Sequence, residues 1–353
     1  MDLKTLRRKI DRIDTGIVEA LNERARISVE VGQIKSAQKA GIYAPERERE
    51  VFSRIKALNK GPMTDAAFEA VYREIMSSSI ALEKPLSVAY LGGEGSNSYT
   101  AARRKFGAQA ICVAASGIEE VFHKVEHEEC DHGIVPIENS VEGTVTHTAD
   151  VLTDSSLQVC AQITVKITHN LMANGPLDRI RKVYSNPQVL GQCRNWLLAN
   201  LPPDKVAQVS VAATTDAARI AVTEKGSSAI APIDCARIYG LKVLKTNIQD
   251  IAHNSTRFFV IGPSDSRPTG NDRTSIVFSI KDRPGVLYAM LAPFAKNGIN
   301  LTKIESRPIK KKAWDYYFFV DLVGHREETK VKNALKKLEG MCKFLKVLGS
   351  YPA

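Results

Sequence analysis

The sequence predicts a multidomain protein in which an all-helical region is followed by an α/β region and then by a small α+β domain. Three observations support this prediction. Apolar residues repeat every seven positions from Leu3 to about Ala40, which predicts one long helix. Within residues 85–263, short β-prone apolar runs alternate with helical segments. Residues 272–353 show the order βαββαβ, which is typical of a ferredoxin-like sandwich.

Length and composition are those of an ordinary globular protein. The chain has 353 residues, more than a single core usually holds, with 44% hydrophobic and 25% charged residues. It shows no apolar run of membrane-spanning length and no signal-peptide apolar region, so we expect a cytoplasmic protein that is not bound to membrane. The net charge of +10 is dispersed among acidic residues, which favours small anionic ligands over nucleic acid.

The cysteines and histidines show no pattern of a metal or redox site. The six cysteines are scattered, without a CxxC pair, and are expected to be reduced thiols. His123 and His127 are one helical turn apart, but no further ligands stand at metal spacing. The glycine-rich loop that begins at Gly92 does not continue as a GxGxxG dinucleotide motif. We therefore expect neither a metal nor another cofactor.

A charged residue interrupts the heptad pattern of the first helix. One apolar stripe runs from Leu3 through Ile17 to Val31, and Arg24 falls within it. A charge in a buried seam is costly unless it is paired. Arg24 therefore indicates a bound anion or an acidic partner.

Two further cations share a flanking stripe of this helix. Arg7 and Lys35 are 28 residues apart, which separates them by about 42 Å at the rise of an α-helix. They cannot both reach one small ligand from one chain, so Arg7 would have to come from a second subunit whose helix runs antiparallel. Arg24 and Lys35 are about 16 Å apart by the same rise and can both reach a point between them.

Two shorter helices follow. Gly41 ends the first helix, and Pro45 opens a second with acidic residues in its first turn. Thr64 is suited to cap a third helix, on which Ser79 and Glu83 lie one turn apart on one face. The polar positions of the three helices are thus available to one site.

These helices carry LRxKIDxID and ERxxIxxEVGxIK on the first, PERERE on the second and SSSIALE at the end of the third. The set resembles the all-α chorismate mutase family over about residues 1–84. The resemblance implies chorismate as the substrate and the following site residues: Arg7 from a partner chain, Arg24, Lys35, Arg47, Glu48, Ser79 and Glu83.

By this resemblance the arginines hold the two carboxylates of chorismate. Lys35 and Glu83 would bond the ether oxygen as it gains negative charge, while Glu48 and Ser79 would orient the ring. A pericyclic rearrangement needs only such a grip on a compact conformer and donors aimed at the developing charge. Many family members have glutamine at the position of Glu83, and a carboxylate repels the ether oxygen unless it is protonated. We therefore expect the activity to fall as pH rises. The alternative is an ordinary solvated helix face.

The α/β region ends in a polar stretch that leads into a strand. Asn254 to Arg257 are polar, and Phe258 to Ile261 form a β-prone run expected to be buried on both faces. In a parallel sheet the polar residues would lie at the strand's mouth, where such sheets bind ligands. The alternative is a strand preceded by a polar turn. Earlier in the region, a glycine-rich loop over 92–98 opens a helix and offers amides to an anion.

The remaining segments of this region alternate and predict at least two lobes. Strands are expected at 87–91, 111–114, 133–138, 159–168, 182–184, 208–211 and 228–231, and helices near 99, 118–128, after 143, after 187 and from 215.

Six ordered motifs run through this region: GxxGSxS, IVPIENSxxGxV, YSxPQxxxQC, ATTDAA, APxxxAxxYGL and NSTRFFVIG. Together they resemble prephenate dehydratase over about residues 86–263. The resemblance implies a two-lobed α/β fold like that of periplasmic binding proteins, with prephenate between the lobes. It also implies the following site residues: Ser96, Ser98, Glu138, Asn139, Ser140, Gln188, Thr214, Thr215, Thr256, Arg257 and Phe258.

In the implied reaction, prephenate loses its ring hydroxyl and carbon dioxide together and becomes aromatic. Thr256 would donate to the departing hydroxyl, with Asn139 and Glu138 orienting or relaying the proton. Arg257 would either pair structurally or bind the side-chain carboxylate. The sequence leaves open whether prephenate or its amino analogue arogenate is preferred.

A loop of linker composition over 263–271 leads to the final domain. Its run DRPGVLYAMLAPFAKNGINLTKIESRP resembles the ACT regulatory domain, and IESRP with KVLGSYP resembles its phenylalanine-binding version. The resemblance implies a homodimer or homotetramer that binds phenylalanine at a subunit interface through the following residues: Gly285, Val286, Leu287, Asn300, Glu305, Ser306 and Arg307. The alternative is a domain that only dimerises.

The three resemblances together predict a phenylalanine-inhibited enzyme with both activities. The chorismate mutase domain would span 1–84, the dehydratase 85–263 and the ACT domain 272–353. Two alternatives remain open: a dehydratase whose mutase site is inactive, and a non-catalytic protein that senses an amino acid.

Overall fold

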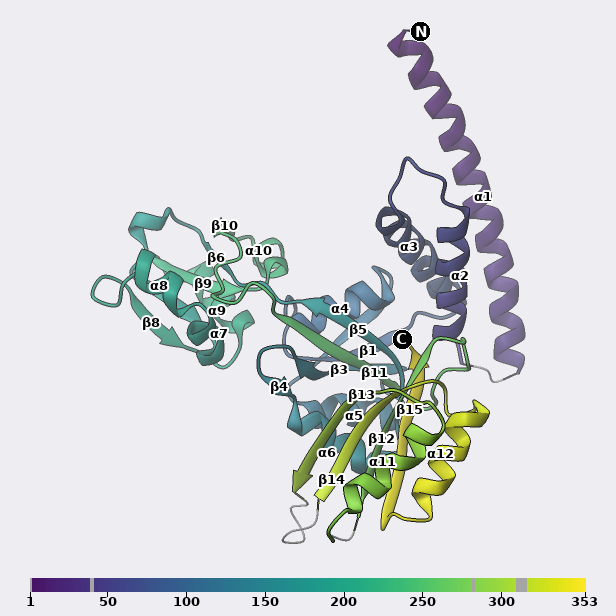
Figure 1. Cartoon of the computed structure of the whole chain (residues 1–353). Helices are drawn as coiled ribbons and strands as arrows, with labels where there is room; N and C mark the ends of the chain where they lie inside the picture. Colours follow the sequence, from purple (N-terminus) through teal and green to yellow (C-terminus); the bar gives the residue numbers. More distant parts are fainter. Residues whose placement is uncertain (1, 39–40, 281–282, 309–315) are drawn as a thin grey trace. The chain divides into compact units, whose positions relative to one another are not determined.

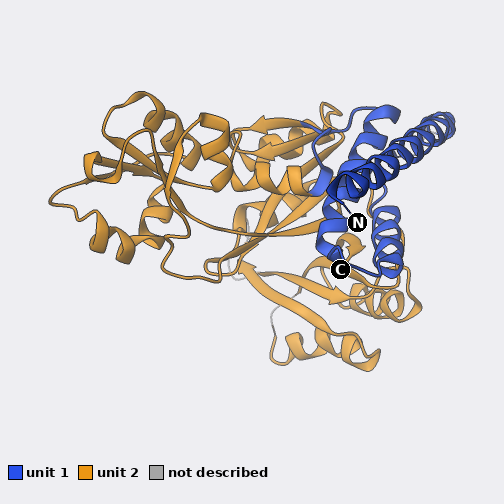
Figure 2. Ribbon diagram, turned by 90° about the horizontal axis from the view of Figure 1, so that it is seen from above, with its two compact units in different colours: residues 1–87, 105–111 blue, residues 88–104, 112–353 orange. Residues whose placement is uncertain are grey.

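The computed structural model describes residues 2–38, 41–280, 283–308 and 316–353 (Figure 1). The chain divides into two compact units (Figure 2). Unit 1 holds residues 1–87 and 105–111, and unit 2 holds residues 88–104 and 112–353. Among the described residues, no helix is both long enough and apolar enough to cross a bilayer.

Unit 1 contains three α-helices: α1 (Leu3–Ala37), α2 (Pro45–Leu58) and α3 (Asp65–Glu83). Local signals explain where they begin. Asp2 accepts from the Thr5 amide, Thr64 accepts from the Ala67 amide, and proline stands in the first turn of α2. The three predicted helices are confirmed, although the expected end of the first one, near residue 40, lies outside the described residues.

Helix α1 is covered on only part of its length. It packs against α3, yet it contains no buried residue. Its N-terminal apolar side chains are more than half exposed at Ile10, Ile13 and Ile17. The heptad stripe predicted from the sequence is therefore present and largely uncovered within one chain.

Unit 2 begins with a lobe built on one sheet. Its strands are β1 (Ser87–Leu91), β2 (Ile111–Ala115), β3 (His132–Asn139), β4 (Gly143–Thr144), β5 (Gln158–Lys166) and β11 (Ser255–Gly262), in the order β2-β1-β3-β11-β5 with β4 on β3. The lobe also holds α4 (Asn97–Phe106), α5 (Ile118–Glu126) and α6 (Thr146–Asp154).

The direction of β11 corrects one prediction. Phe258 to Ile261 are buried as expected, but β11 runs antiparallel to both β3 and β5 instead of lying in a parallel sheet. A helical crossover within one sheet makes neighbouring strands parallel. The chain reaches β11 from the second lobe by an extended segment, so that constraint does not apply.

The second lobe has its own five-stranded sheet. Its strands are β6 (Asn170–Ala173), β7 (Lys182–Ser185), β8 (Ala207–Ser210), β9 (Ser227–Ala231) and β10 (Lys242–Lys245), in the order β10-β6-β9-β7-β8. Its helices are η1 (Leu177–Arg179), α7 (Pro187–Gln192), α8 (Arg194–Asn200), α9 (Thr214–Thr223) and α10 (Ile233–Tyr239). The patterns did not predict the four-residue strands β6 and β10 or the seven-residue helices α8 and α10, because such short segments show no clear periodicity.

Two chain segments cross between the lobes, one after β5 and one before β11. They are tied to each other by backbone bonds, from the Ile167 amide to the Asn254 carbonyl and from the Ile248 amide to the His169 carbonyl, both 2.9 Å. The polar stretch singled out in the sequence thus lies where the chain returns to the first lobe.

The last 82 residues fold as β12 (Asp272–Ser279), α11 (Val286–Lys296), β13 (Leu301–Pro308), β14 (Tyr316–Val323), α12 (Thr329–Glu339) and β15 (Phe344–Pro352). The antiparallel order β13-β14-β12-β15 confirms the ferredoxin-like prediction. One face of this sheet packs on its two helices. The opposite face shares a hydrophobic core with the first lobe, including Val277 and Tyr351 against Phe259. Residues 272–353 therefore pack directly against the first lobe, in addition to being joined to it by the linker at 263–271.

Candidate active sites

Unit 1 encloses a cavity of about 480 Å³ among its three helices. The structure brings most of the predicted mutase residues to its wall: Arg24, Lys35, Arg47, Glu48, Ser79 and Glu83. Four arginines line it: Arg24, Arg47, Arg54 and Arg73. Arg54 lies two turns after Arg47 on the same face of α2. Arg54 was not predicted, although that spacing could have revealed it.

Charged pairs fix the side chains at one end of this cavity. Lys35 Nζ lies 3.1 Å from Glu83 Oε2 and donates to the Ile42 carbonyl. Glu48 accepts from Lys105 Nζ at 2.6 Å and from the Tyr43 hydroxyl at 3.0 Å. Lys105 lies outside the helical motifs, so no local sequence signal could assign it to this cavity.

Hydrogen bonds hold Arg24 on the wall of this cavity. Its guanidinium donates to the Ser79 hydroxyl, which in turn donates to the Ile75 carbonyl at 2.8 Å. Burial lowers the pKa of Arg24, and the positive charges of Arg47 and Arg54 lower it further. A bound anion would relieve both effects. The interrupted heptad thus places a cation where an anionic ligand is favoured.

Arg7 is not in the cavity. It is exposed on α1, and the 17 residues between it and Arg24 span about 26 Å along the helix axis. Within one chain it cannot reach a ligand held by Arg24.

Unit 2 contains a larger cavity of about 1190 Å³ between its two lobes. It is lined by both chain crossings, by the loop before α4 and by the start of α9. The predicted dehydratase residues on its wall are Ser96, Ser98, Asn139, Gln188, Thr214, Thr215, Thr256 and Phe258.

Hydrogen bonds fix the orientation of the Asn139 amide. Its Oδ1 accepts from the amides of Val141 and Glu142, at 2.9 and 3.2 Å. Its Nδ2 must then donate, and it does so to Asn254 Oδ1 at 2.8 Å and to Thr256 Oγ1 at 2.9 Å. Because Thr256 accepts this bond, its own hydroxyl hydrogen can be donated toward the cavity.

Two helix N-termini face the cavity from opposite lobes. Helix α4 begins at Asn97 and α9 begins at Thr214, and each has ten residues. Their first amides and hydroxyls suit carboxylate groups. Among the described lining residues, Arg219 is the only lysine or arginine, and it bonds Asp216. A dianionic substrate would therefore be held mainly by neutral donors.

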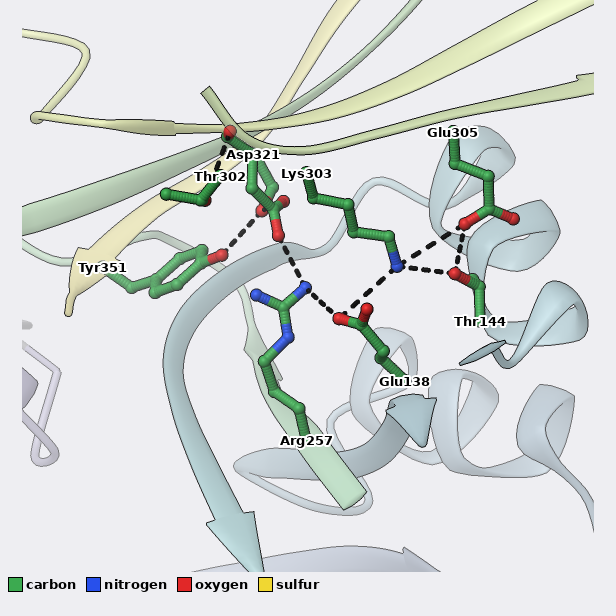
Figure 3. A network of polar contacts seen from close by, with 9 residues as sticks. Glu138, Thr144, Arg257, Thr302, Lys303, Glu305, Asp321 and Tyr351 are labelled. Carbon is green, nitrogen blue, oxygen red and sulfur yellow. Dashed lines mark hydrogen bonds and ion pairs between the residues drawn. The ribbon is translucent and has the colours of Figure 1, made fainter. Parts of the chain in front are cut away.

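Glu138, Ser140 and Arg257 do not line this cavity, although their motifs suggested it. Successive residues of a strand point to opposite faces, so Thr256 faces the cavity and Arg257 faces away. Arg257 lies 3.2 Å from Glu138 and 2.6 Å from Asp321 (Figure 3). Ser140 bonds the backbone of the returning crossing. Of the two alternatives for Arg257, the structure shows the ion pair.

Several polar residues of the cavity were not predicted as site residues, and three of them are joined by hydrogen bonds: Glu142, His169 and Gln192. Glu142, from the first lobe, accepts from Gln188 and Gln192 of the second lobe. His169, on the first crossing, lies 2.7 Å from Gln192. Burial lowers the pKa of His169 and favours its neutral form. These contacts join segments far apart in sequence. Gln192 belongs to the motif YSxPQxxxQC, but no local pattern assigns Glu142 or His169 to it as a partner.

A smaller cavity of about 250 Å³ lies at the start of α11. Gly285, Val286 and Leu287 line it, as do Tyr288 and Phe318. Gly285 has φ +77°, a left-handed conformation that glycine adopts without strain. The other predicted effector residues do not line it: Asn300, Glu305, Ser306 and Arg307.

Those four residues lie on or beside β13. Asn300 precedes the strand, and Ser306 is exposed. Glu305 accepts from Thr144, and Arg307 lies 2.7 Å from Asp150. One chain therefore does not assemble the whole predicted effector set around one cavity, because alternate residues of β13 face the first lobe.

Three family models match the chain: chorismate mutase type II over residues 6–84, prephenate dehydratase over 88–266 and the ACT domain over 274–340. A bifunctional chorismate mutase/prephenate dehydratase of Aquifex aeolicus is 48% identical and covers 99% of this chain and 98% of its own length. Its counterpart in Stutzerimonas stutzeri is 43% identical and covers 99% and 97%.

A solved structure agrees with these matches. The prephenate dehydratase of Arthrobacter aurescens, determined in complex with L-Phe, is 31% identical with a TM-score of 0.69. The match covers 76% of this chain and 90% of that one. The predicted fold class and the predicted pair of enzyme domains are confirmed. The chain belongs to the family of bifunctional chorismate mutase/prephenate dehydratases with a C-terminal ACT domain.

Proposed function

We propose that the cavity of unit 1 rearranges chorismate to prephenate and that the interlobe cavity of unit 2 converts prephenate to phenylpyruvate. The observation that carries the proposal is the Thr256 hydroxyl, which Asn139 fixes as a donor between two anion-binding helix N-termini. A chain that only sensed an amino acid would have no need of such a donor. The setting of the reaction would be phenylalanine biosynthesis in the cytoplasm.

A coupled assay tests this function. Chorismate supplied to the purified chain should yield phenylpyruvate without added metal or nucleotide. Accumulation of prephenate alone would leave only the mutase, and binding of prephenate without turnover would favour the sensing alternative. A chain that converts prephenate but not chorismate would have an inactive mutase site.

In the mutase cavity, catalysis depends on positioning and charge. Arg24 and Arg47 would hold the carboxylates of a compact conformer, with Arg54 adding to the positive field. Lys35 would donate to the ether oxygen as the carbon–oxygen bond breaks. Glu48, held by Lys105, and Ser79, held by Arg24, would orient the ring.

The role of Arg7 requires a second chain. Its distance from Arg24 excludes a contribution within one chain, and the apolar stripe beside it is exposed. Pairing of two α1 helices in antiparallel directions would cover this stripe and bring Arg7 of one chain to the cavity of the other. The proposal therefore includes at least a homodimer.

In the dehydratase cavity, the Thr256 hydroxyl would donate a hydrogen bond to the departing ring hydroxyl. That hydroxyl would leave as water with a proton taken up from solvent, while the ring carboxylate leaves as carbon dioxide. The helix N-termini would bind the carboxylates through Ser96, Ser98, Thr214 and Thr215. The shortage of cations on the described lining suits this chemistry, because a strongly paired ring carboxylate would resist decarboxylation. Phe258 would pack against the ring.

Replacing Glu83 with glutamine tests the mutase assignment. A glutamine amide donates to the ether oxygen at any pH, whereas a carboxyl donates only when protonated. We expect Glu83→Gln to keep its mutase activity to higher pH than the unaltered chain. Glu69→Gln, on the same helix outside the cavity lining, is the control and should leave the pH profile of chorismate consumption unchanged. If Glu83→Gln and the unaltered chain had identical pH profiles of mutase activity, the role of the Glu83 carboxyl as a donor to the ether oxygen would be contradicted.

Phenylalanine is the proposed effector, because the relative from Arthrobacter aurescens was solved in complex with L-Phe. Binding would use the cavity at the start of α11, with Asn300 and Ser306 added across a subunit interface. Millimolar phenylalanine should slow phenylpyruvate formation. Gly285→Val should weaken this inhibition, since valine is strained at φ +77° and narrows the cavity. A rate insensitive to phenylalanine would contradict the effector proposal.

A further inference from the structure

The strand β11 presents two faces to two different parts of unit 2. Thr256 and Phe258 line the interlobe cavity. Arg257 and Phe259 face the sheet of the ACT domain, where the Phe259 ring lies 5.4 Å from Tyr351. The Arg257 guanidinium lies over the Phe259 ring, 5.1 Å from its centroid. A change on the ACT side of this strand can therefore reach the catalytic side within one residue.

The neighbouring strand repeats this arrangement. In the β3–β11 register, Asn139 is opposite Thr256, and Glu138 is opposite Arg257. On each strand, a residue that lines the cavity is therefore adjacent to a residue of the ion pair on the opposite face. Asn139 is next to Glu138 on β3, and Thr256 is next to Arg257 on β11. The Asn139–Thr256 pair and the Glu138–Arg257 ion pair therefore lie on opposite faces of the same two strands.

The ACT domain supplies the partners that hold them (Figure 3). Asp321 on β14 lies 2.6 Å from Arg257, and Lys303 on β13 lies 3.6 Å from Glu138. Asp321 is fixed in turn by the Ser275 hydroxyl at 2.6 Å. Its side chain is only 7% exposed, and that of Arg257 only 12%. Although burial opposes the charge, Asp321 holds the pKa of Arg257 above its ordinary value.

Strand β13 of the ACT domain also supports a second part of the cavity wall. Lys303 Nζ donates to Thr144 Oγ1 at 2.6 Å, and Glu305 accepts from the same hydroxyl. Thr144 and Thr146 line the interlobe cavity. Arg307 bonds the Thr146 carbonyl. Two separate wall segments of the dehydratase cavity are thus held from behind by residues of the regulatory domain.

We propose that Asp321 and Lys303 of the ACT domain are positioning residues for dehydration, acting through Arg257 and Glu138 on the Thr256–Asn139 pair. The proposal rests on the dehydratase function proposed above. Removing one partner of a buried ion pair is strongly destabilising, because the other charge is left buried and uncompensated. A displacement of about 1 Å is enough to lower a catalytic rate by up to about 10²-fold.

The test measures prephenate turnover by the full chain with Asp321→Asn and Lys303→Met. We expect kcat to fall about tenfold or more for Asp321→Asn and less for Lys303→Met, with KM changed little, because neither residue touches substrate. Chorismate consumption should be unchanged. If Asp321→Asn does not fold, Lys303→Met decides the question.

A matched control separates positioning from stability of the domain contact. Lys346 also joins the ACT domain to the first lobe, donating to the Leu152 and Thr153 carbonyls at 2.8 and 3.0 Å. It touches neither Glu138 nor Arg257, so Lys346→Met should keep the kcat of the unaltered chain. An equal fall in kcat for Lys346→Met would overturn the proposal, as would an unchanged kcat for both Asp321→Asn and Lys303→Met.

A double variant tests whether Asp321 acts through Arg257. If Asp321 acts through Arg257, Asp321→Asn combined with Arg257→Met should be no slower than the slower single variant. Losses that multiply would overturn the route through Arg257. If the unaltered chain did not turn over prephenate at all, the dehydratase function itself would fail, which is a result distinct from any ratio between variants.

Discussion

Thr256→Ala should abolish phenylpyruvate formation while prephenate accumulates from chorismate. Alanine removes the one hydroxyl that Asn139 fixes as a donor toward the interlobe cavity. Loss of a positioned proton donor lowers rates by about 10²- to 10⁴-fold. The measurement follows chorismate, prephenate and phenylpyruvate together in one reaction.

Two controls make the Thr256 result specific. The mutase works in the other unit, so the rate of chorismate loss should not change. Thr256→Ser keeps the hydroxyl and should retain much of the dehydration. Unchanged phenylpyruvate formation by Thr256→Ala would exclude Thr256 as the donor.

Lys35→Met should reduce mutase activity by about 10²- to 10³-fold, the range found when a donor to developing negative charge is removed. Methionine keeps most of the side chain's length and packing, so the loss measures the charge. Lys35 lies on the cavity wall and bonds Glu83 at 3.1 Å. The assay is chorismate consumption, with prephenate dehydration measured separately as the unaffected activity.

Lys56→Met is the matched control for Lys35. Lys56 pairs with Glu69 in the same unit and does not line the cavity. Removing an exposed ion pair has little effect on stability, and the mutase rate should stay near that of the unaltered chain. Equal losses for Lys35→Met and Lys56→Met would show that the charge of Lys35 has no special role.

Much of the fold was predictable because its signals are local. The heptad from Leu3, the cap at Thr64 and the βαββαβ order of 272–353 each depend on residues near one another in the chain. The direction of β11 was not predictable in this way. It depends on the chain leaving one lobe and returning from another, which no local pattern records.

The sites divide in a similar manner. Motifs marked Arg24, Lys35 and Thr256, because their residue types and spacing are distinctive. They could not separate Thr256 from Arg257, since adjacent residues in a motif point to opposite faces of a strand. They also could not find Lys105, which reaches the mutase cavity only through folding.

The sequence alone therefore determined the three N-terminal helices, the order of the domains, the family and the polar stretch before Phe258. Tertiary structure decided which residues of that stretch serve the cavity and which serve the ACT domain. The physical reason is that side-chain direction follows from strand pairing, and Asp321 meets Arg257 only when segments 64 residues apart are brought together. Sequence motifs can identify such residues as candidates, but their contact partners are known only from the tertiary structure.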